Sequence, residues 1–117
     1  MSGQVPVQQS PWVGLQPVAG GRFEVAVTAL QQFWRRRVQL QRFERRVGRW
    51  VDVRTLVLTE QLGGGGAAPP FASASFITTR TAPFRPDVPK GTTIRAVFPL
   101  SQARPCYLGG VSQIRRT

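Results

Sequence analysis

Residues 20–60 read "GGRFEVAVTALQQFWRRRVQLQRFERRVGRWVDVRTLVLTE". Apolar and polar residues alternate here in short runs without a 3.6-residue period, and glycine or clustered charge separates the runs, which is typical of β-strands. In residues 22–29 the alternation is regular, and one face carries Phe23, Val25, Val27 and Ala29. Because successive side chains of a strand point to opposite sides, we expect this face to lie in a core.

A hairpin is expected directly after this strand. Residues 36–43 form its first arm, residues 50–59 form its second, and Gly48 lies in the turn. The side chains that we expect on the inner face are Val38, Leu40, Val51, Val53 and Val57. Since side chains alternate, the outer face then carries Arg35, Arg37, Gln39, Gln41, Asp52 and Arg54.

The rest of the chain supplies shorter strands, separated by proline, glycine and polar residues. The further strands are expected at 11–18, 71–79, 92–98 and 111–116, with a loop at 60–70, a connection at 80–91 and an extended arm at 1–10. About seven evenly spaced strands favour one all-β domain at 11–117, a β-sandwich or small barrel without a helix longer than about two turns. Its predicted core contains Val25, Val27, Val38, Leu40, Val53, Ile77, Ile94 and Ala96.

The composition narrows the chemistry that this domain can perform. The chain has no histidine and a single cysteine, Cys106, so zinc sites, blue-copper sites and histidine-dependent triads are not expected. Five acidic residues show no spacing that suggests a carboxylate pair. We therefore expect a non-enzymatic protein without metal or cofactor.

The net charge is +11, and fifteen of the sixteen basic residues are arginine. Arginine suits bidentate and stacked contacts with carboxylates or phosphates, so an acidic partner is expected. The residues that we expect in a basic partner-binding face are Arg35, Arg36, Arg37, Arg45, Arg46, Arg49 and Arg54. Two alternatives stay open: a docking face for an acidic surface, or a solvated face in which arginine stems cover apolar surface.

Nucleic acid is a second class of acidic partner. A basic protein that binds single strands also needs aromatic side chains on which bases stack. Only Phe33, Trp34 and Phe43 lie beside arginines in this way. An oligonucleotide-binding barrel is therefore the alternative interpretation rather than the first one.

Several motifs resemble bacterial immunoglobulin-like and fibronectin-III-like β-sandwich modules. The motifs are "VQLQR" at 38–42, "GRW" at 48–50 followed by Val53, "GTTIRA" at 91–96 and "GVS" at 110–112. The resemblance implies an immunoglobulin-like sandwich, and Trp50 is expected to be a large core anchor beside Val38, Leu40 and Ile94. These modules usually have tyrosine where this chain has Ile94, so the phenolic hydrogen bond that pins a strand corner is absent.

Modules of this kind decorate tailed-bacteriophage virions and also occur in secreted proteins. The N-terminus lacks the basic and apolar segments of a signal peptide, and no run of about 18 apolar residues is present. The resemblance therefore favours a decoration or cement subunit of a virion. Its expected partners are acidic capsid or tail subunits, or further copies of itself, and not a membrane, and the arm at 1–10 is expected to be ordered by such contacts. A secreted or cell-surface adhesion module is the third alternative, after the nucleic-acid-binding barrel.

Overall fold

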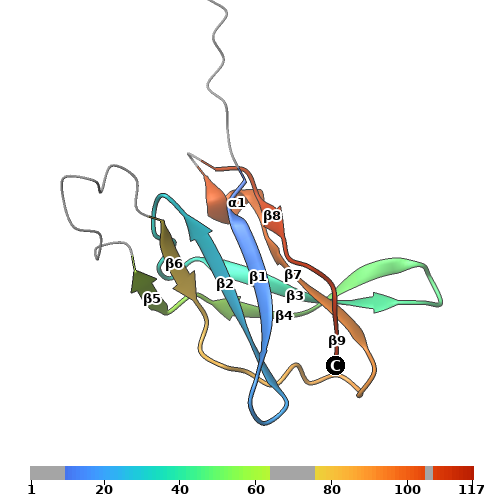
Figure 1. The fold of residues 1–117 in the computed structure, drawn as a ribbon. Helices are drawn as coiled ribbons and strands as arrows, with labels where there is room; N and C mark the ends of the chain where they lie inside the picture. Colours follow the sequence, from blue (N-terminus) through green and yellow to red (C-terminus); the bar gives the residue numbers. More distant parts are fainter. Residues whose placement is uncertain (1–9, 64–75, 105–106) are drawn as a thin grey trace, which may run out of the picture.

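Two antiparallel sheets pack face to face in the computed structural model, which describes residues 10–63, 76–104 and 107–117 (Figure 1). The first sheet has the order β1 (Trp12–Val18), β2 (Arg22–Ala29), β6 (Ile77–Arg80) and β5 (Glu60–Gly63). The second has the order β4 (Arg49–Val57), β3 (Arg37–Glu44), β7 (Thr93–Phe98) and β8 (Gly110–Val111), and β9 (Arg115–Arg116) also pairs with β7. The prediction of an all-β sandwich is confirmed.

The order of the strands is that of immunoglobulin-type sandwiches. Lettered along the chain, the first sheet corresponds to A-B-E-D, and the second to C′-C-F-G. The core fills the space between the sheets, and its fully buried members include Leu15, Val25, Val27, Phe33, Val38, Leu40, Leu58, Ile94, Ala96 and Phe98. Six of the eight predicted core residues are therefore buried, whereas Val53 and Ile77 are only half-buried.

A β-bulge explains the difference at Val53. Leu40 pairs with Arg54 but Gln41 pairs with Asp52, so Val53 is an extra residue without a partner in β3. One inserted residue exchanges the two faces of a strand. As a result Leu56 is buried and Val57 is exposed, so the prediction that Val57 shares an inner face with Val51 and Val53 is wrong.

Other boundaries also differ from the expected ones. Residues Glu60–Gly63 form β5, where a loop was expected, because the chain leaves the second sheet after β4 and joins the first, where Thr59 N–H donates to Arg80 O. The expected strand at 111–116 is interrupted between β8 and β9, where the Ser112 hydroxyl accepts from Ala96 N–H and donates to Gln113 O. The predicted arm at 1–10 and the segment at 64–75 lie outside the described residues, except for Ser10.

Helical structure is limited to one turn in the described ranges, α1 (Leu100–Ala103). Among these residues, no helix has the length and apolar character that a membrane crossing requires.

The corner before β7 is held by threonines. Thr92 and Thr117 both donate their hydroxyl hydrogens to Pro89 O, and Thr92 N–H donates to the Thr117 hydroxyl oxygen. Ile94 lies in the core with no exposed surface. Two short hydroxyl side chains therefore fix the corner that a tyrosine fixes in immunoglobulin domains.

Candidate partner-binding site

The carboxylates of the protein are all engaged by its own side chains. Arg80 contacts Glu24 and Glu60 with nitrogen–oxygen distances of 3.7 and 3.0 Å, Arg42 contacts Glu44, and Arg54 contacts Asp87. Asp52 accepts a hydrogen bond from Gln41. Since these are the five acidic residues of the chain, most of the arginines have no intramolecular carboxylate partner.

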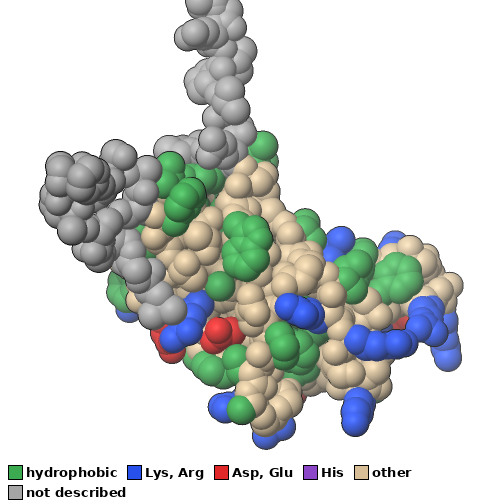
Figure 2. Space-filling model, viewed as in Figure 1, with side chains coloured by type: hydrophobic (Ala, Val, Ile, Leu, Met, Phe, Trp, Pro, Cys, Tyr) green, Lys and Arg blue, Asp and Glu red, His purple; other side chains and the backbone are tan. Residues whose placement is uncertain are grey.

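Five of the seven arginines that we expected in one basic face form two separate groups. Arg35 and Arg37 lie where β3 begins, whereas Arg45, Arg46 and Arg49 lie at the tip of the β3–β4 hairpin. Eight residues of β3 separate the groups by about 25 Å at the usual rise of a strand. Figure 1 shows this hairpin reaching beyond the rest of its sheet, and Figure 2 shows basic side chains around it and along the lower margin of the visible face.

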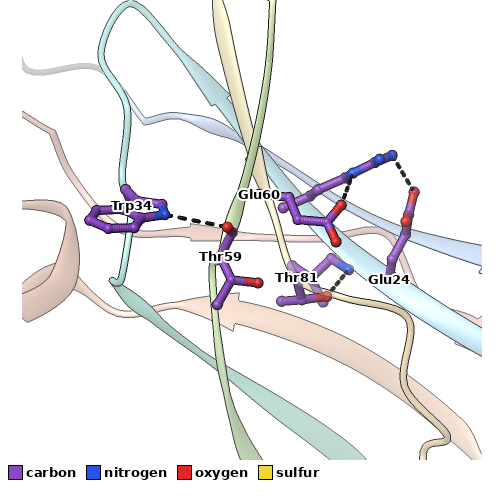
Figure 3. Close-up of polar contacts among 7 residues, drawn as sticks. Glu24, Trp34, Thr59, Glu60 and Thr81 are labelled. Carbon is purple, nitrogen blue, oxygen red and sulfur yellow. Dashed lines mark hydrogen bonds and ion pairs between the residues drawn. The ribbon is translucent and has the colours of Figure 1, made fainter.

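The first group surrounds an exposed tryptophan, and we name it the Trp34 cluster: Trp34, Arg35, Arg37, Val57 and Thr59. The indole is 51% exposed, and its Nε1–H donates to Thr59 O at 3.3 Å (Figure 3). The guanidinium carbon of Arg35 lies 4.6 Å from the centre of the ring, within the range of a cation–π contact. These five residues line an open hollow of about 420 Å³.

The backbone of Arg35 is held in a conformation that residues with a side chain rarely adopt. Its φ angle is +66°, in the left-handed region. Arg35 N–H donates to Leu58 O at 2.7 Å, and Arg36 N–H donates to Phe33 O at 3.0 Å, so bonds to neighbouring segments enforce the turn. Strain of this kind costs of the order of 1 kcal/mol and is frequent at binding sites.

Substitutions of Arg35 should show this strain directly. We expect Arg35→Gly to keep or raise the free energy of unfolding, by up to about 1 kcal/mol, because glycine adopts a positive φ without a steric penalty. Arg35→Val should lower it by about 1–2 kcal/mol, since β-branched residues tolerate this region least. Urea denaturation measures both values, and an Arg35→Val variant as stable as the glycine variant would contradict the strained backbone.

The second group lies at the hairpin tip, beside the carboxylate of Glu44. A hydrogen bond from the Arg42 guanidinium and another from Arg46 N–H hold the pKa of Glu44 below its usual value. Arg45, Arg46 and Arg49 are exposed. This group therefore presents positive charge to a partner but no free aromatic ring. The nearest large rings, those of Phe43 and Trp50, pack against each other on the outer face of the sheet.

Trp50 belongs to that outer face and is not a core anchor. It pairs with Phe43, their ring centres are 5.3 Å apart, and the Arg95 guanidinium lies 4.3 Å from the Trp50 ring. Before the bulge at Val53, the even-numbered residues of β4 lie on the outer face, so Trp50 is half-buried there. The other expected anchors, Val38, Leu40 and Ile94, lie in the core with no exposed surface.

The bulge also reverses the predicted orientation of Arg54. Because Arg54 pairs with Leu40, it shares the inner face of the sheet, where its guanidinium lies 5.7 Å from the Phe84 ring and donates to Arg85 O. Arg36 is likewise half-buried and donates to Gln102 O at 3.1 Å. Neither side chain belongs to the exposed groups.

Sequence reasoning missed two members of the Trp34 cluster. Val57 was expected in the core, and Thr59 was taken as the end of a strand. Trp34 itself was noted only as an aromatic residue beside arginines, together with Phe33, which is fully buried and cannot stack on a base. The run of three arginines after a tryptophan was the available signal.

Comparison with known proteins identifies no relative: no family model matches the chain, and no curated protein and no solved structure is significantly similar to it.

Proposed function

We propose that the protein is a non-enzymatic docking module that binds an acidic protein surface through the Trp34 cluster. The observation that carries this proposal is the position of an exposed tryptophan under one arginine and beside another, on a strained backbone. Tryptophan and arginine are the residues most enriched among those that dominate binding energy at protein interfaces.

The distribution of charge supports a carboxylate partner. Every carboxylate of the chain already has a partner within the protein, so Arg35 and Arg37 have no intramolecular competitor for an incoming acidic group. An exposed ion pair alone contributes only about 0–1 kcal/mol. Burial of the Trp34 ring and the Val57 side chain against the partner would add the apolar contribution that such pairs lack.

The setting that we propose is a larger assembly, with the protein as a decoration or cement subunit of a phage capsid or tail. Its support is the resemblance of the sequence motifs to immunoglobulin-like virion modules, together with a strand order of the same type. A fold alone does not define a function, so the binding experiment below tests the docking site independently of the setting.

The experiment measures the affinity of the protein for a fluorescein-labelled polyglutamate by fluorescence anisotropy at physiological ionic strength. We expect Arg35→Gln/Arg37→Gln to lower the affinity at least about tenfold, as for residues at the centre of an interface. Arg45→Gln/Arg46→Gln changes the net charge by the same amount and should lower it less than about threefold, as expected for charges at a rim.

Two outcomes would contradict the proposal. Equal losses in the two double variants would show that only net charge attracts the polyanion. Tighter binding to oligo-dT than to polyglutamate, with an affinity that falls about as the fourth power of salt concentration or more steeply, would instead support nucleic-acid binding, for which the Trp34–Arg35 stack is the available base platform.

A further inference from the structure

The free edge of β4 presents backbone groups that no strand of the described residues pairs with. Leu58 N–H donates to Arg36 O, which lies directly opposite in the continued ladder between β3 and β4. In an antiparallel pair, bonded and non-bonded residue pairs alternate. Val57 and Thr55 therefore lie in non-bonded pairs, with their N–H and C=O groups directed away from β3 to the open edge.

The edge of β1, by contrast, is closed by two side chains. Leu15 N–H donates to the Gln113 side-chain oxygen at 3.2 Å, and Leu15 O accepts from Arg115 Nε at 2.9 Å. Pro17 provides no N–H group in the same strand. Of the two sheet edges that β1 and β4 form, the described residues therefore leave that of β4 open to a further strand.

Two hollows flank the open edge, one on each face of the sheet. The hollow of the Trp34 cluster lies on the outer face, beside Val57. The second hollow, of about 270 Å³, lies between β4 and the segment Thr81–Phe84, and Leu56, Ala82 and Pro83 are among the residues that line it. Because alternate side chains of an added strand point to opposite faces, each hollow would receive every second side chain.

We infer that an extended acidic segment of the partner protein adds to the sheet as a strand beside β4. Its backbone would bond to Thr55 and Val57, its carboxylates would lie over Arg35 and Arg37, and its small apolar side chains would enter the hollow beside Phe84. This inference rests on the proposed function and specifies its binding mode. A second copy of the chain fits less well, because pairing two β4 edges would bring two sets of like charges onto one sheet.

The test uses a peptide of alternating glutamate and valine, with the protein variants Val57→Pro and Val57→Thr. Proline is tolerated at this position of an edge strand because the Val57 N–H makes no bond to β3. It removes the N–H that would bond to an added strand. We expect Val57→Pro to lower the affinity for the peptide at least about tenfold. Val57→Thr keeps the N–H and exchanges one methyl group for a hydroxyl, so it should lower the affinity by less than about threefold. In the wild type, the peptide should slow amide hydrogen exchange at Thr55 and Val57.

Several results would overturn strand addition. These are unchanged affinity in a folded Val57→Pro variant, no slowing of exchange at Thr55 and Val57 in the bound wild type, preferential binding of oligo-dT, or a wild-type dimer that Val57→Pro dissociates. The exchange measurement decides the question if Val57→Pro does not fold. A loss of peptide affinity in Arg35→Gln/Arg37→Gln alone would retain the proposed function and reject this binding mode, whereas no loss in any variant would reject both.

Discussion

Phe33→Ala is expected to lower the free energy of unfolding by about 3–5 kcal/mol, the range for truncation of a large buried aromatic residue. Phe33 has no exposed surface, and its ring centre lies 4.8 Å from that of Phe98 and 5.5 Å from that of Tyr107, both edge to face. The truncation would leave a cavity between the sheets and remove two aromatic contacts. A domain of this size should lose about 10–20 °C in Tm.

The neighbouring residue provides the matched control. Trp34→Ala removes a larger side chain, but the indole is half exposed, so the loss should stay within about 1 kcal/mol. Both variants can be followed by circular dichroism during urea denaturation, which does not depend on the deleted fluorophore. Equal losses in the two variants would contradict the assignment of Phe33 to the core and Trp34 to a binding surface.

The double variant Thr79→Val/Thr81→Val is expected to lose about 2–6 kcal/mol, because each substitution leaves a buried N–H without an acceptor at a cost of about 1–3 kcal/mol. The Thr79 hydroxyl accepts from Phe33 N–H at 3.0 Å. The Thr81 hydroxyl accepts from Val25 N–H at 3.1 Å (Figure 3). Both threonines are almost completely buried. Valine has nearly the same shape as threonine, so the loss reports the hydrogen bonds and not the packing.

Thr78→Val is the control for this pair. Thr78 lies on the opposite face of β6, and its hydroxyl contacts that of Thr28 at 2.9 Å in a partly buried position. Water can replace that partner, so a loss below about 1 kcal/mol is expected by urea denaturation. If the double variant lost no more than this control, the two N–H groups would have another acceptor.

The alternation of apolar residues predicted the sheets well where one strand face is consistently apolar. Val25, Val27, Val38 and Leu40 are fully buried because strands with a period of two commit one set of side chains to the core. The tip of the hairpin was also expected at Gly48, which has a positive φ of 66°.

The second hairpin arm shows why the candidate site was harder to predict. In "WVDVRTLVL", residues 50–58, apolar side chains occur at both odd and even positions, so the sequence is compatible with either face pointing inward. The bulge at Val53 selects one orientation before it and the other after it, and this register depends on packing against the second sheet. Arg54 and Val57 were therefore assigned to the opposite face, whereas Trp50 was expected in the core because of the motif resemblance and not because of the alternation.

Phe33 shows a second reason why the site could not be predicted from the sequence. It lies between β2 and β3, outside both strands, so no periodicity could distinguish it from Trp34. Only the tertiary fold decides which of the two adjacent rings fills the core. The same holds for Arg35, whose positive φ follows from bonds to Leu58 and to Phe33 and not from its own preference.

The closure of the β1 edge by Gln113 and Arg115 has a consequence for biosynthesis. These two bonds join Leu15 to residues 98 and 100 positions further along the chain, so β1 is protected only after almost the whole domain has left the ribosome. Until then, the early hairpin of β1 and β2 exposes a strand edge and an apolar face, the features by which nascent chains aggregate. Folding is consequently expected to be slow, on the scale of milliseconds to seconds for sandwiches of high contact order, and to benefit from chaperones during synthesis.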